Sequence, residues 1–166
     1  FMLLVSHLGE MDPSITPRMP VLNSPLLSIH VSIIMVSYAL LSLTFVCAVA
    51  YFCTQRSTKT NIVQINSQLT TLSQIFLYPA ITTLGLGIFI GAIWANISWG
   101  NYWGWDPKET WALITFMIYA IPLHSYSLPQ FRKPDKYHLF MFLAFLSILM
   151  TYFGVNYILG GMHSYA

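Results

Sequence analysis

The sequence predicts an all-α protein, a polytopic membrane bundle of about four transmembrane helices with an external loop rich in tryptophan. Of its 166 residues, 56% are hydrophobic and only 7% are charged, whereas about 25% of the residues of a soluble domain carry a charge. Four stretches contain no charge at all, and each is as long as the roughly 20 apolar residues that a bilayer span needs. A soluble helical bundle is therefore disfavoured. The net charge of only +2 also provides no basic face for nucleic acid.

Apolar run length divides the chain into an external lead-in over 1–25 and a membrane domain over 26–166. The runs predict spans at about 26–53, 76–97, 110–127 and 137–159. Because the chain begins with phenylalanine and lacks the charged start of a signal peptide, we interpret it as a piece of a longer chain.

Two polar connectors, over 54–74 and 128–136, carry five of the seven Lys and Arg residues. By the positive-inside rule, both connectors face the cytoplasm or its equivalent. The lead-in, the tryptophan-rich loop and the C-terminus then lie on the outer side of the membrane.

Two features within the spans predict how the helices pack. Gly87, Gly91 and Ala95 recur every four residues in the second span, which gives a smooth stripe for close packing of a neighbouring helix. Pro122 in the third span lacks a backbone N–H, so we expect the carbonyl near Ile118 to lose its helical partner.

All five tryptophans fall within 94–111, around the loop between the second and third spans. An interfacial aromatic belt does not require the glycines that stand between them. Indole rings offer flat faces, and glycines let the backbone approach a planar ligand closely, so we favour a binding surface for a flat aromatic ligand. Trp103 and Trp105, beside the glycines, are expected to contribute more to binding than Trp94 in the second span. The expected binding residues are Trp99, Trp103, Trp105, Trp111 and Asp106.

Two histidines flank this loop at the outer end of the membrane domain. His30 lies near the start of the first span, and His163 follows the end of the fourth. Ionisable side chains at a membrane are functional candidates by default, and we expect this pair to ligate a planar metal macrocycle on both axial faces. His124 lies apart, near the inner end of the third span, while His138 is expected at the membrane interface and His7 in the exposed lead-in.

The loop from Trp99 to Trp111, WGNYWGWDPKETW, resembles the tryptophan-rich WWD signature of the haem-handling proteins of cytochrome c biogenesis. The ending YFGVNYILGGMHSY and the segment PLLSIHVS are similar to one branch, the CcsA (ResC-type) proteins of System II, and this resemblance covers about 21–165. The System I relatives CcmC and CcmF share the core of the signature but look less like the DPKETW form found here.

The resemblance implies roles for His30, His163 and His124. His30 and His163 match the external pair that ligates haem b, iron protoporphyrin IX, which is a substrate rather than a resident cofactor. His124 matches a membrane histidine of an inner haem site, whose partner ligand lies in a CcsB (ResB) portion outside this chain. Asp106 and Glu109 are poor neighbours for haem propionates, although Lys108 could offset their charge, so the acids could instead fix the loop or face the acceptor.

The resemblance also implies an activity of the holocytochrome c synthase type, in which the haem vinyl groups join the cysteine thiols of a CxxCH apocytochrome c outside the membrane. No catalytic base or nucleophile is expected in the chain, because the thiols come from the acceptor and the chemistry sits on the haem. The implied partners are CcsB, the apocytochrome, thiol-reducing proteins and membrane lipids, in the bacterial inner membrane or the thylakoid membrane.

Three alternatives stay open from the sequence. The protein could export or chaperone haem without ligating it, or it could be a b-type membrane cytochrome that passes electrons through bound haem. A structural membrane bundle with an aromatic girdle is the third alternative.

Overall fold

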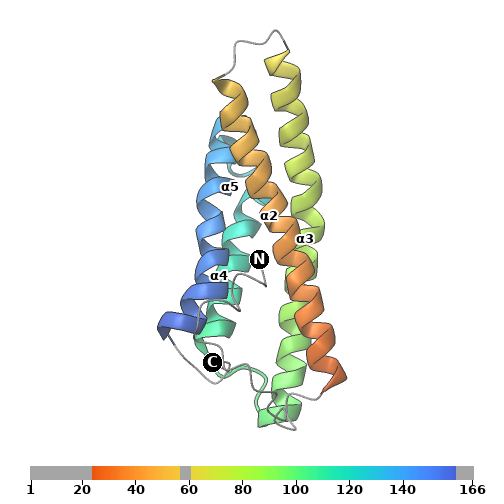
Figure 1. The fold of residues 1–166 in the computed structure, drawn as a ribbon. Helices are drawn as coiled ribbons and strands as arrows, with labels where there is room; N and C mark the ends of the chain where they lie inside the picture. The colour runs from red at the N-terminus through yellow and green to blue at the C-terminus, as the bar shows by residue number, and fades with distance from the viewer. Residues whose placement is uncertain (1–23, 57–60, 160–166) are drawn as a thin grey trace.

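The computed structural model describes residues 24–56 and 61–159, and every regular element among them is a helix, which confirms the predicted all-α fold. Figure 1 shows α2 and α3 as a long antiparallel pair with α4 and α5 packed alongside. In chain order the elements are α2 (Pro25–Gln55), α3 (Ile62–Trp99), α4 (Pro107–Ala120), the 3₁₀ turns η2 (Ile121–His124) and η3 (Pro129–Arg132), α5 (Pro134–Leu149) and the π-helix η4 (Met150–Leu159).

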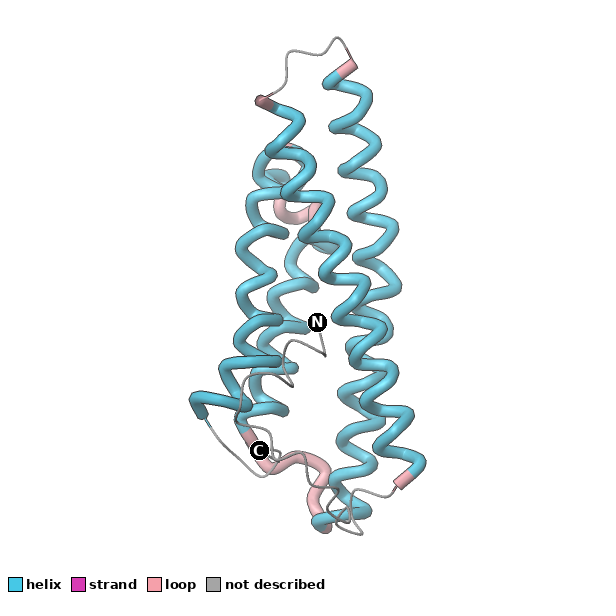
Figure 2. The backbone as a smooth tube through the Cα atoms, viewed as in Figure 1, coloured by secondary structure: helices cyan, strands magenta, loops and turns pink. Residues whose placement is uncertain are grey.

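Three helical segments within the described residues are long and apolar enough to cross a membrane, namely Pro25–Gln55, Ile62–Trp99 and Pro134–Val155. The protein is therefore an integral membrane protein. The third predicted span is built differently, because α4 has only 14 residues and a 3₁₀ turn, η2, extends it. Figure 2 shows the loop between α3 and α4 at the end of the bundle opposite the end of α2 and the start of α3.

The second helix begins earlier than the sequence predicted. Most of the expected connector over 54–74 is helical, since α3 starts at Ile62. Ile65, Leu69 and Ser73 follow one another at helical spacing and are at least partly buried, which is the pattern of an amphipathic helix. Run length alone missed this pattern because the other face of the segment is polar.

The expectation that Pro122 leaves a carbonyl without a partner is wrong. The α-helix ends at Ala120, and the Ile121 N–H donates to the Ile118 carbonyl. The chain tightens into the 3₁₀ turn η2, which contains Pro122. Such tightening is a common way to satisfy carbonyls at the end of a helix.

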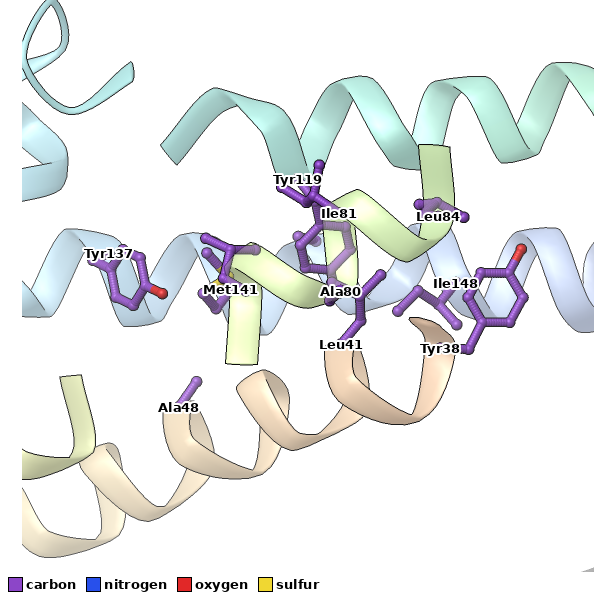
Figure 3. Packing of buried hydrophobic residues seen from close by; sticks show 12 residues of the cluster. Tyr38, Leu41, Ala48, Ala80, Ile81, Leu84, Tyr119, Tyr137, Met141 and Ile148 are labelled. Atoms are coloured by element: carbon purple, nitrogen blue, oxygen red, sulfur yellow. The ribbon is translucent and has the colours of Figure 1, made fainter. Parts of the chain in front are cut away.

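Residues from α2, α3, α4 and α5 form the core, as Figure 3 shows for Leu41, Ile81, Tyr119 and Met141. The predicted small-residue stripe on α3 packs against α2. A Cβ atom added at Gly87 would lie 2.5 Å from Cδ1 of Ile34, so the close approach of the two backbones depends on the missing side chain.

His138, which the sequence predicts at the membrane interface, is buried within the bundle. Its side chain is 0% exposed, because its register on α5 turns it toward α2 and α3. Its ring stacks on Tyr51 with centroids 4.2 Å apart, and Nε2 lies 3.0 Å from Oγ1 of Thr70. The Tyr51 hydroxyl in turn donates to Oδ1 of Asp135 over 2.6 Å. These contacts join three helices at the end of the bundle away from the tryptophan loop.

We expect His138→Ala to lower the free energy of unfolding by about 2 kcal/mol, because the change opens a cavity in packed protein and removes a buried hydrogen bond. Denaturant unfolding of the purified protein in detergent measures the loss. Val63→Ala, at a position of α3 that is 85% exposed, is the control and should change little. Equal stability of the two variants would contradict the structural role of His138.

Candidate functional site

A cavity of about 230 Å³ opens at the end of the bundle that carries the tryptophan loop. Pockets that bury a whole drug-sized ligand measure roughly 300–1,000 Å³, so this cavity suits one edge of a larger planar molecule. Most of its wall is aliphatic or aromatic. Lining residues with ionisable or aromatic side chains include His30, Trp94, Trp103, Lys108, Glu109 and Tyr152.

The His30 ring has a fixed orientation on the wall of the cavity. Its Nδ1 lies 2.7 Å from the Gly87 carbonyl oxygen across the α2–α3 interface. A carbonyl oxygen only accepts hydrogen bonds, so Nδ1 carries the proton and, in the neutral ring, Nε2 carries the lone pair. A backbone partner of this kind is what orients a metal-ligating histidine and fixes its tautomer.

The acidic residues after the loop hold the start of α4 in a capping box. Asp106 accepts from the Lys108 N–H over 2.9 Å. The Glu109 carboxylate reaches back to the N–H groups of Gly104 and Asp106 over 2.9 and 3.3 Å. Such reciprocal bonds satisfy donors that a helix start leaves open. Of the interpretations that the sequence allowed for these acids, the geometry supports fixing of the loop.

Lys108 brings positive charge to the edge of the cavity. It lies in the first turn of α4, before the predicted span over 110–127. Burial lowers the pKa of its ammonium group, and the neighbouring Asp106 carboxylate acts in the opposite direction. The capping box thus places a partly desolvated cation beside an apolar cavity.

The five tryptophans differ in burial: Trp94 is buried, Trp105 is exposed and the other three are half-buried. Trp94 is 1% exposed and meets Trp99 edge to face, with centroids 4.8 Å apart. Trp103 meets Trp105 in the same way at 5.9 Å. Trp105 is 73% exposed and has a φ of 55°, a left-handed conformation that is strained for a residue with a side chain. Trp111 lies within α4, half-buried.

The structure gathers only part of the predicted site around the cavity. His30 and Trp103 line it, whereas Trp99, Trp105, Trp111 and Asp106 stand outside its lining. Trp94 lines it although the sequence analysis ranked it low. Its position three residues after Gly91, on the stripe that faces α2, was the signal that could have identified it.

Of the other two predicted ligands, the structure describes only His124, which stands outside the lining of the cavity. His163 lies outside the described residues. His124 ends η2 and is exposed, with Nδ1 3.0 Å from the Ala120 carbonyl oxygen, so its Nε2 also carries the lone pair in the neutral ring. In residues 24–56 and 61–159, no cluster of three or more histidine, cysteine and acidic side chains is arranged to hold a bare metal ion.

Residues 1–163 match a family profile described as cytochrome C assembly protein. Protein NrfI of Wolinella succinogenes is 44% identical over 173 aligned positions, which cover 99% of this chain and 18% of that protein. The cytochrome c biogenesis protein CcsA of Chlamydomonas reinhardtii is 37% identical over 153 positions, 90% of this chain and 43% of that protein. CcsA of Hordeum vulgare is 44% identical over 102 positions, 61% of this chain and 31% of that protein. The chain thus spans less than half the length of these relatives.

Proposed function

Because the chain belongs to the family of cytochrome c assembly proteins, we propose that it acts in cytochrome c maturation by carrying haem b and presenting it to CxxCH apocytochromes c. The observation that carries this proposal is the His30 ring, held by the Gly87 carbonyl at the wall of a cavity lined with tryptophan. Haem suits these neighbours because it has a flat apolar face, an iron that takes nitrogen ligands, and negative charge at its edge.

The cavity residues fit haem in three respects. Nε2 of His30 is the nitrogen that would ligate the iron from one side, and His163 stays the predicted ligand on the other side. Trp94 and Trp103 offer flat apolar surface. Lys108 would attract the propionates, while Glu109 is already bonded to the N–H groups of the loop.

In the proposed reaction, each acceptor thiol adds across a haem vinyl group. The sulfur bonds to one vinyl carbon, a hydrogen goes to the other, and a thioether results. The chain contributes position, because holding haem with an edge outside the cavity turns a rare encounter into an effectively unimolecular step. The histidine of the acceptor would then replace a histidine of this chain as a ligand of the iron. His124 would serve an inner site completed by CcsB.

Charge placement supports an orientation with the tryptophan loop outside. Arg56 follows α2 at the end of the bundle away from the loop, and Arg132, Lys133 and Lys136 lie around the start of α5 (Figure 1). The positive-inside rule then puts the cavity on the outer or lumenal side of a bacterial inner membrane or thylakoid membrane. Its partners there would be the CcsB portion, fused or separate, the apocytochrome and proteins that keep its thiols reduced.

Co-expression of the full-length protein with a CxxCH reporter tests this proposal. We expect haem that stays on the reporter after denaturation, because a thioether survives where coordination does not. A reporter with both cysteines changed to serine is the control and should carry no haem. Haem bound to the membrane protein without reporter maturation would indicate a carrier or an electron-transfer cytochrome. Absence of haem from the purified protein would indicate a structural bundle.

A further inference from the structure

A side chain at Gly91 of α3 would overlap the His30 ring. A Cβ atom added at Gly91 would lie 2.5 Å from Cε1, 2.8 Å from Nδ1 and 3.3 Å from Nε2 of His30. Separations under 3.0 Å are essentially never seen for real Cβ atoms. The ring edge that carries both nitrogens therefore occupies the space that any other residue at this position would fill.

Gly91 also leaves open the carbonyl that the ring binds. In an α-helix, residues four apart stack on one face, and the N–H of the later residue bonds to the carbonyl of the earlier one. A side chain at Gly91 would stand beside the Gly87 oxygen, where His30 Nδ1 lies 2.7 Å away. The position of the ring and its hydrogen bond thus both depend on the absence of a side chain at Gly91.

We propose that Gly91 is a positioning residue for haem ligation by His30, an inference that rests on the proposed function. With glycine here, the imidazole reaches the Gly87 carbonyl, its proton stays on Nδ1, and Nε2 keeps the lone pair that coordinates iron. With alanine here, the ring must turn away or α2 must move outward. Either change breaks the hydrogen bond from Nδ1 and misplaces Nε2.

Helix packing alone is the competing explanation for this glycine. The neighbouring glycines of α3 distinguish packing from positioning of His30. An added Cβ at Gly87 would meet the aliphatic tip of Ile34, and one at Gly85 would meet Cε2 of Phe116 at 3.2 Å. Of these three glycines, Gly91 is the one packed against an imidazole. Gly85→Ala is therefore a matched control, because it adds the same methyl group to the same helix away from His30.

The experiment titrates haem b into the purified full-length protein and records both the dissociation constant and the low-spin absorption spectrum of nitrogen-ligated iron. Loss of a group that orients a metal ligand typically costs 10–100-fold in affinity. We expect Gly91→Ala to weaken binding at least about tenfold and to lose the low-spin spectrum, while Gly85→Ala keeps both. Wild-type affinity and spectrum in Gly91→Ala would overturn the inference.

A double variant, His30→Ala/Gly91→Ala, separates positioning from packing. Once the ring is gone, the added methyl group has nothing to displace, so the double variant should bind haem as His30→Ala does. If Gly91→Ala alone fails to fold, folding of the double variant shows that the clash is with His30, whereas failure of both would assign Gly91 to helix packing. An affinity of the double variant below that of His30→Ala would also assign Gly91 to helix packing. Haem binding by His30→Ala equal to wild type would instead reject the proposed function.

Discussion

His30→Ala is expected to remove most of the haem that co-purifies with the full-length protein and to abolish maturation of a CxxCH reporter. The change deletes an axial nitrogen whose partner, the Gly87 carbonyl, fixes both its orientation and its tautomer. The haem-to-protein ratio of the monodisperse fraction measures the loss. Ser32→Ala is the control, because Ser32 lies on the same helix, is exposed and donates to the Ser28 carbonyl of its own helix.

Added imidazole distinguishes lost ligation from lost packing in this variant. His30→Ala leaves space beside Gly91 where a free imidazole molecule can sit. If His30 is a ligand, imidazole should restore haem retention and the low-spin spectrum. Full haem content and normal reporter maturation in His30→Ala without imidazole would refute the assignment of His30.

The sequence was most informative where apolar runs are long and uninterrupted. The first span was predicted over 26–53, and α2 runs from Pro25 to Gln55. The start of α3 was missed because a half-polar helix does not register as an apolar run. The sequence predicted a missing backbone donor at Pro122 but not the bond from the Ile121 N–H to the Ile118 carbonyl, because that bond depends on local backbone geometry.

The sequence predicted some of the residues that line the cavity and missed others. Histidine beside a tryptophan-rich loop predicted a planar ligand, and the structure places His30 and Trp103 on one cavity. Helical register turns His138 inward among α2, α3 and α5, and the loop before α4 leaves Trp105 exposed. The contact between Gly91 and His30 joins residues 61 apart in the chain, which no single-sequence pattern reveals.

The structure also changes the expected ranking of the tryptophans. From sequence, Trp103 and Trp105 were expected to matter more than Trp94. Trp94 is buried and lines the cavity, while Trp105 stands outside the lining and is mostly exposed. An exposed side chain has few contacts to lose, so its removal costs little.

Trp94→Ala is therefore expected to have the largest combined effect of the tryptophan substitutions. It removes a fully buried indole between the cavity and Trp99, and loss of such a ring costs about 3–5 kcal/mol of stability. It should also lower the haem-to-protein ratio of the molecules that remain folded, because one wall of the cavity disappears. Trp94→Phe, which keeps an aromatic face, should retain more of both. Denaturant unfolding and haem content of the monodisperse fraction, measured beside Trp105→Ala, test this ranking. A greater loss of haem in Trp105→Ala than in Trp94→Ala would place the ligand on the outer surface of the loop rather than in the cavity.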